Sequence, residues 1–273
     1  MDPSNSPRND NAAPPQSGSL KADLVMALRF YSRLPSGSAP HERPDLKRIA
    51  MALPFASLVI GIGPAAVLFI ATVSGMPPLF AALLSLAIFA IVTGAMSEDA
   101  VADAADGLFG GATRERRLEI LKDSRHGTYG VLAIVFVIGL KAAALSAIAA
   151  RNPLAAMLVW LAAATLARSA SFYLPLTLGQ ARTDGAAATA GVVSRNAFAI
   201  GSVFAALVAF VLAAPFAGIL GFVLAIVLGG LTLFAWTRLC DQLVGGVTGD
   251  LIGAAQALVE IALLATFMRM IVT

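Results

Sequence analysis

The chain has 273 residues, of which 58% are hydrophobic and only 13% are charged. Because a soluble domain carries about 25% charged residues, this composition excludes an ordinary soluble fold and predicts an all-α, polytopic integral membrane bundle. Lys and Arg beside the cytoplasmic ends of membrane spans account for the net charge of +3, so no nucleic acid partner is predicted. The single cysteine excludes an intrachain disulfide.

The N-terminal part of the chain precedes the first apolar span. Residues 1–20 are rich in Pro, Ser and Asn and lack an apolar core, which predicts a disordered tail rather than a signal peptide. Residues 21–35 place Leu24, Leu28 and Tyr31 on one helical face. This pattern predicts a short amphipathic helix that lies at the membrane interface.

Residues 21–273 are predicted to form a single transmembrane domain with the lipid bilayer as its surroundings. Apolar stretches of about 20 residues recur along it, each long enough to cross a hydrocarbon core of roughly 30 Å. Prolines between some of them favour tight reversals of the chain. About seven spans are predicted, at residues 49–73, 79–97, 129–150, 154–174, 197–214, 217–237 and 251–271.

The placement of Lys and Arg predicts the orientation, since these residues accumulate on the cytoplasmic side of a membrane protein. They precede the first span and recur in the segments 98–128, 175–196 and 238–250, whereas the opposite side has only Arg151 and Arg269. We therefore expect a multi-pass protein of the bacterial cytoplasmic (inner) membrane, with its N-terminus and these three loops in the cytoplasm.

The cytoplasmic loop 98–128 holds seven of the sixteen acidic residues. Asp99, Asp103 and Asp106 directly continue the second predicted span, at a spacing of i, i+4, i+7 that places them on one helix face. Carboxylates that repel each other beside the membrane favour a bound cation, and oxygen ligands favour Mg²⁺ or Mn²⁺ over zinc. Asp123 returns to the same predicted metal site as a fourth ligand.

The residues after Asp123 lead into the third predicted span. Arg125 is a candidate clamp for a phosphate group, because a guanidinium matches phosphate oxygens in geometry and charge. His126 is expected to be a polar interface residue rather than a metal ligand.

A second glycine-rich segment, GGVTGD, opens the last predicted span at residues 245–250. Glycines at a helix N-terminus leave backbone N–H groups free for an anion, and no Lys-Ser/Thr follows as in a P-loop. The candidate anion-binding residues are Gly245, Gly246, Thr248 and Gly249, and Asp250 is a further candidate metal ligand.

Three charged residues lie inside predicted spans, where ionisable groups usually face the bundle interior and have a partner. Lys141 and Glu260 form either a structural ion pair or, in the case of Lys141, a contact with substrate. Arg168 lies about two turns into its span from the cytoplasmic side and is a candidate contact for a phosphate or carboxylate.

Three motifs, in this order, resemble the cobalamin synthase family (adenosylcobinamide-GDP ribazoletransferase). They are FYSRLP at residues 30–35, the aspartate run with TRERRLEILKDSRHGTYG at 99–130, and GGVTGDLIGAAQALVE at 245–260. The resemblance covers roughly residues 24–270. Glu98 and Ala100 depart from the pattern, because the family commonly has an apolar residue and a glycine at these positions.

The resemblance implies the last assembly step of the adenosylcobalamin nucleotide loop. In that step the 5′-hydroxyl of α-ribazole (or of its 5′-phosphate form) attacks the cobinamide-side phosphorus of adenosylcobinamide-GDP, GMP leaves, and Mg²⁺ is the required cofactor. The aspartates named above would hold one or two Mg²⁺ ions, and Asp106 or Asp123 would accept the hydroxyl proton. Candidate residues that stabilise phosphate charge are Arg33, Arg125 and Arg168, and the GGVTGD segment would seat a phosphate or the guanosine end.

Two other functions remain as alternatives. A CDP-alcohol phosphotransferase shares the metal chemistry, but its D-G-x2-A-R pattern does not fit the residues after Asp106-Gly107. A secondary transporter would use the intramembrane charges, but the chain shows no persuasive internal repeat. A surface rich in small residues, such as 142–150, serves either a homo-oligomer or packing within the bundle.

Overall fold

The computed structural model describes residues 19–37, 44–123, 125–182 and 193–273. The predicted tail therefore lies outside the described residues, except for its last two. Within the described part the fold is helical, with an isolated parallel β-bridge between Gln180 and Val247. The helices are α1 (Leu20–Tyr31), α2 (Leu46–Val73), α3 (Pro78–Thr93), α4 (Met96–Gly110), α5 (Arg114–Ile120), α6 (Thr128–Arg151), α7 (Pro153–Ser171), α8 (Tyr173–Thr177), α10 (Arg195–Val244) and α11 (Gly249–Val272).

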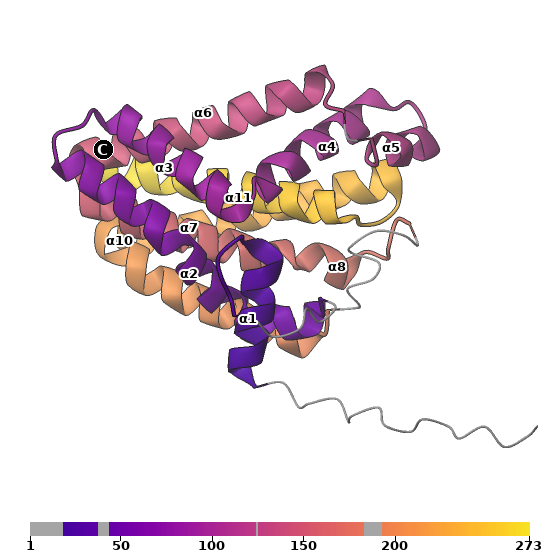
Figure 1. The fold of residues 1–273 in the computed structure, drawn as a ribbon, viewed down its shortest axis with the longest axis horizontal. Helices are drawn as coiled ribbons and strands as arrows, with labels where there is room; N and C mark the ends of the chain where they lie inside the picture. The colour runs from indigo at the N-terminus through magenta and orange to yellow at the C-terminus, as the bar shows by residue number, and fades with distance from the viewer. Residues whose placement is uncertain (1–18, 38–43, 124, 183–192) are drawn as a thin grey trace, which may run out of the picture.

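The long helices form a bundle around α7, which is the most buried of them and packs against α2, α6, α10 and α11. Its buried faces are rich in alanine, which lets neighbouring backbones approach closely. In Figure 1, α4, α5 and α8 lie toward one end of the bundle, and the C-terminus lies at the other end. The predicted all-α polytopic fold is confirmed.

The number of candidate spans among the described residues is lower than the predicted seven. Five helices are long and apolar enough to cross a membrane, or six if the bent pair α3 and α4 counts as one span. The difference arises because α10, with 50 residues, contains both predicted spans 197–214 and 217–237.

Helix α10 is not straight, because Gly218 has the non-helical angles φ 73° and ψ 167°. The rings of Phe210 and Phe222 lie only 5.2 Å apart across this break. Twelve residues of straight helix would separate them by about 18 Å, so the chain reverses its direction near Gly218.

The predicted span 79–97 is interrupted, and the acidic helix does not continue its axis. Gly94 (φ 68°) and Ala95 (φ 57°) both adopt the left-handed conformation, which ends α3 and starts α4. The axes of α3 and α4 differ by 89°. The expectation that the aspartates extend the span directly is therefore wrong, because two left-handed residues turn α4 across the end of the bundle.

The amphipathic helix predicted after the tail is α1, which ends at Tyr31 before the predicted boundary. Asp23 Oδ1 accepts a hydrogen bond of 2.6 Å from Arg48 Nε, which ties α1 to the start of α2. The Arg33 N–H donates to the carbonyl of Val92 at 2.8 Å and joins the end of α1 to α3. These contacts fix Tyr31 beside the end of α7, where the cavity described below lies.

Candidate active site

Helix α4 and the loop before α6 bring together three side chains able to hold a metal ion. One ligand atom each from Asp99, Asp103 and His126 lies within 4.8 Å of the others. His126 Nε2 is 3.8 Å from Asp99 Oδ1, and His126 Nδ1 is 3.7 Å from Asp103 Oδ1. Two carboxylates one helical turn apart and an imidazole form a donor set for a divalent cation. The carboxylate oxygens suit Mg²⁺ or Mn²⁺, whereas the imidazole nitrogen is a donor that transition metals accept more readily than Mg²⁺ does.

Asp106 has different partners from the other two aspartates of α4. Its Oδ2 accepts the Gly127 N–H at 2.6 Å, and its Oδ1 accepts the Gly130 N–H at 2.9 Å. Both donors belong to the N-terminus of α6, where backbone N–H groups lack helical acceptors. A Cβ at Gly130 would collide with this buried carboxylate. Asp106 therefore holds the loop that carries His126 against α4.

Asp123 pairs with Arg125 rather than with the aspartates of α4. Arg125 Nε and Nη2 donate to the two carboxylate oxygens at 3.0 and 2.7 Å. These hydrogen bonds lower the pKa of Asp123 to about 2. The Arg125 side chain is 87% exposed, so the pair lies on the surface beside the metal-ligand group rather than inside it.

The GGVTGD segment turns the chain from α10 into α11. Its backbone is hydrogen-bonded to the segment that follows α8. The Val247 N–H donates to Gly179 O at 2.9 Å, and the Ala181 N–H donates to Val247 O at 3.0 Å. Thr248 caps α11 by accepting the Leu251 N–H at 3.4 Å. Gly245 ends α10 with φ 63°, and Gly246 lies so close to Ala181 that a Cβ would clash. These contacts give the first glycines a structural role.

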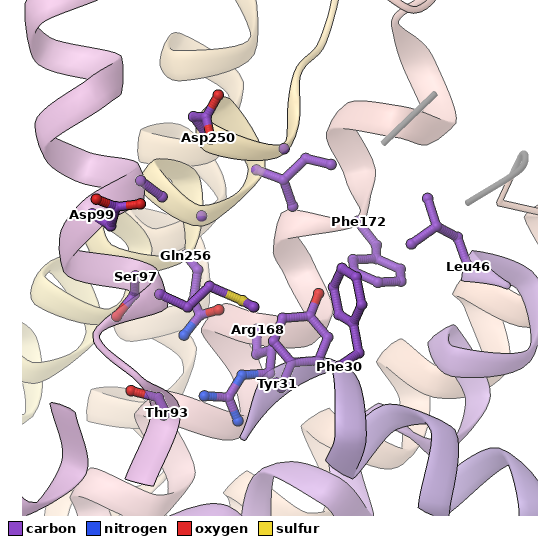
Figure 2. A pocket seen from close by; sticks show the side chains of 15 residues that line it. Phe30, Tyr31, Leu46, Thr93, Ser97, Asp99, Arg168, Phe172, Asp250 and Gln256 are labelled. Carbon is purple, nitrogen blue, oxygen red and sulfur yellow. The ribbon is translucent and has the colours of Figure 1, made fainter. Parts of the chain in front are cut away.

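A cavity of about 210 Å³ opens between α1, α4, α7 and α11. Figure 2 shows Asp99 and Asp250 at one end of it and Tyr31, Arg168 and Gln256 toward the other. Asp99, which also belongs to the metal-ligand group, is 65% exposed, whereas Arg168 is 1% exposed. The lining residues are Phe30, Tyr31, Leu46, Thr93, Met96, Ser97, Asp99, Ala100, Arg168, Phe172, Gly249, Asp250, Ile252, Gly253 and Gln256.

Two predicted substrate contacts lie outside this lining. Lys141 is buried in an ion pair of 2.8 Å with Glu260, whose other oxygen accepts the Trp160 indole N–H at 3.0 Å. The sequence left two interpretations of Lys141 open, and the structure shows the ion pair with Glu260. The side chain of Arg33 lies against Gly94 at the α3–α4 bend. Asp250, by contrast, lines the cavity and lies 3.8 Å from Arg182.

Sequence reasoning did not select several residues that the fold brings to the site. His126 was expected to be an interface residue, because nothing in its local sequence indicates that α4 lies opposite it. Phe172, between α7 and α8, and Gln256 of α11 line the cavity but look like ordinary residues of apolar spans. Only the folded arrangement places them beside Asp99.

Comparisons with known proteins identify the family. The family model described as cobalamin-5-phosphate synthase matches residues 23–268. The chain is 47% identical to the adenosylcobinamide-GDP ribazoletransferase of Azorhizobium caulinodans, with 90% of this chain and 94% of that protein covered. Proteins of the same name from Bradyrhizobium diazoefficiens and Rhizobium etli are 42% and 41% identical, covering 89% of this chain and 92% and 94% of theirs.

No solved structure matches the chain. The family match covers nearly all of the described helices, including α4 and the cavity-lining residues of α7 and α11. The resemblance inferred from three motifs is thereby confirmed, and the chain belongs to the cobalamin-5-phosphate synthase family.

Proposed function

We propose that this protein is a Mg²⁺-dependent transferase of a bacterial inner membrane. It joins adenosylcobinamide-GDP and α-ribazole, or the 5′-phosphate of α-ribazole, to give adenosylcobalamin, or its 5′-phosphate, and GMP. The names of its relatives support this reaction. The observation that carries the proposal is that Asp99 belongs both to the metal-ligand group and to the wall of the cavity.

The chemistry is a substitution at the cobinamide-side phosphorus. The 5′-oxygen of the nucleoside forms a bond to this phosphorus, the bond from the phosphorus to the bridging oxygen breaks, and GMP leaves with that oxygen. The hydroxyl proton passes to Asp99 or Asp250, the carboxylates that line the cavity. This assignment replaces Asp106 and Asp123 because both oxygens of Asp106 accept N–H groups, and a pKa of about 2 makes Asp123 a weak base.

Asp99, Asp103 and His126 would hold the metal ion, because their donor atoms already lie close together. A bound magnesium ion would neutralise charge on the diphosphate and on the leaving group. Asp250 faces the same end of the cavity and is a candidate further ligand.

The site belongs on the cytoplasmic side in this proposal. The metal-ligand group lies at the end of the bundle that carries α5, whose sequence RERRLEI is rich in arginine. Arginine-rich segments stay in the cytoplasm when a membrane protein inserts. Nucleotide substrates are therefore expected to enter from that compartment.

A matched pair of variants tests the metal site. Asp103→Asn removes one charge from the metal-ligand group, and Asp123→Asn makes the same change in the surface pair with Arg125. We expect the first variant to lose at least about a hundredfold in turnover, because even outer-shell partners of metal ligands contribute about 10- to 100-fold. The second should stay within about threefold of the wild type. The assay measures GMP release, and equal activity of the two variants would overturn the assignment.

A further inference from the structure

Arg168 is a buried cation without a hydrogen-bonded acceptor for much of its guanidinium. It is 1% exposed, and its Nε and Nη1 atoms have no hydrogen-bond partner among the described residues. Within that part of the chain, no carboxylate lies at ion-pair distance from it, and its contacts are with the rings of Tyr31 at 5.3 Å and Phe89 at 6.0 Å. Glu98 and Glu260 attract this cation from beyond ion-pair distance. Burial of two guanidinium nitrogens without an acceptor is still costly, and a ligand in the cavity would supply that acceptor.

The walls of the cavity beside Arg168 are aromatic and apolar. Phe30 and Tyr31 pack edge to face with ring centroids 4.8 Å apart, and Phe172 closes the same side. Burial raises the pKa of Tyr31, so this residue stays a neutral phenol and does not supply a counter-charge to Arg168. Aromatic rings and apolar side chains of this kind suit a flat, mostly apolar ligand.

We propose that this cavity binds the aromatic base of the nucleoside substrate, with Arg168 donating to a nitrogen in the plane of the base. The inference rests on the proposed function, which supplies α-ribazole as that nucleoside. Its base is a benzimidazole, a mostly apolar bicyclic ring with one unsubstituted nitrogen as acceptor. With the base at the buried end, the ribose and its 5′-hydroxyl extend toward Asp99 and Asp250, where the reaction takes place.

The lining favours this base over the other groups of the substrates. A phosphate would lose its hydration here and would find one cation, Arg168, with only neutral donors such as Tyr31, Ser97 and Gln256 beside it in the lining. Guanine carries several N–H and amino donors, and the face of the cavity formed by Phe30, Leu46, Phe172 and Ile252 offers them no acceptor. A ring with a single acceptor leaves no polar edge unpaired.

The decisive experiment measures binding of α-ribazole to the full-length protein in detergent by titration calorimetry. Arg168→Met is compared with Arg238→Met, which removes an exposed arginine that also lies over a ring, that of Phe234 at 5.2 Å. We expect binding to weaken roughly 10- to 100-fold for Arg168→Met and to stay unchanged for Arg238→Met. Equal binding by the two variants would overturn the proposal.

Thermal unfolding separates a binding role from a structural one. We expect Arg168→Met to unfold at the same temperature as the wild type or higher, since an unpaired buried charge is removed. A lower unfolding temperature in parallel with weaker binding would contradict the proposal. A second variant, Phe172→Leu, should weaken α-ribazole binding while the KM for adenosylcobinamide-GDP stays unchanged.

The binding titrations, together with turnover assays of the same proteins, distinguish failure of this inference from failure of the proposed function. A wild-type protein that neither binds nor converts α-ribazole contradicts both. If the Arg168→Met and Phe172→Leu variants convert α-ribazole with the KM of the wild type for this nucleoside, only the proposed base site is contradicted. Guanosine or inorganic phosphate binding that depends on Arg168, with α-ribazole binding unaffected, would assign the cavity to another group and overturn this proposal.

Discussion

Asp99 and Asp106 lie seven residues apart on the same helix, yet their carboxylates have different partners. Asp99 is exposed beside Asp103 and His126, whereas Asp106 is buried and accepts two backbone N–H groups at the start of α6. A carboxylate that accepts backbone N–H groups at a helix N-terminus also interacts favourably with the helix dipole. Asp106 therefore supports the loop before α6, whereas the carboxylate of Asp99 is open to a ligand.

Alanine substitutions of the two aspartates should have different effects on stability and turnover. Asp106→Ala leaves the Gly127 and Gly130 N–H groups without their acceptor and should lower the free energy of unfolding by about 2 kcal/mol. Asp99→Ala removes an exposed carboxylate and should change it by less than about 0.5 kcal/mol while abolishing turnover. Unfolding in detergent measures both, and a stable Asp106→Ala protein would show that the two hydrogen bonds contribute little.

The sequence predicted which face of a helix carries the aspartates, because that follows from the helical period alone. It did not predict the partner of each carboxylate, because Asp106 meets a loop 21 residues later in the chain. The position of His126 beside Asp99 and Asp103 was not predicted, for the same reason. The pairing of Lys141 with Glu260 was one of two interpretations, and only the packing of α6 against α11 decides between them.

The element that orients the site is the bend between α3 and α4. Gly94 and Ala95 are both left-handed, and the Ala95 N–H donates to Ala90 O at 2.7 Å to close the end of α3. Glycine adopts this conformation without strain, while alanine pays about 1–2 kcal/mol. The bend turns α4 away from the axis of α3, and Asp99 of α4 lines the cavity.

Exchanging the two small residues tests the bend. Gly94→Ala would strain the backbone and place a Cβ 2.5 Å from Arg33 Nε, so we expect a loss of about 1–2 kcal/mol in stability and a lower turnover. Ala95→Gly relieves strain and should leave the free energy of unfolding equal or up to about 1 kcal/mol higher. Chemical denaturation of the two variants provides the comparison, and the opposite order would mean that the backbone angles differ from those described.

Sequence patterns predicted the long apolar elements well, because length and hydropathy are local properties. They failed where a helix breaks inside an apolar stretch. Gly94 lies within the predicted span 79–97 without a proline or a charged residue beside it to mark the end of α3. In α10 the sequence predicted a reversal at Pro215, but the residue with non-helical backbone angles is Gly218, three positions later.

At the scale of the whole molecule, one buried polar cluster ties three helices of the bundle. Lys141 of α6, Glu260 of α11 and Trp160 of α7 meet inside the bundle, and all three side chains are buried. Removing one member of a buried pair leaves an uncompensated charge, which costs more than removing both.

The single variant should therefore lose more stability than the double variant. Lys141→Met should destabilise the protein by about 3–5 kcal/mol, and adding Glu260→Gln should restore most of the loss, because the glutamine still accepts the Trp160 N–H. Unfolding titrations in mixed micelles measure the coupling. Additive losses in the double variant would show that Lys141 and Glu260 contribute independently.

The most direct test of the whole account is conversion of adenosylcobinamide-GDP and α-ribazole by the purified protein in detergent, with and without Mg²⁺. We expect adenosylcobalamin and GMP to form in equal amounts, and we expect chelation of the metal to stop the formation of both products. Formation of neither product by folded protein in the presence of Mg²⁺ would contradict the proposed reaction. Undiminished turnover after chelation would contradict the metal site of Asp99, Asp103 and His126.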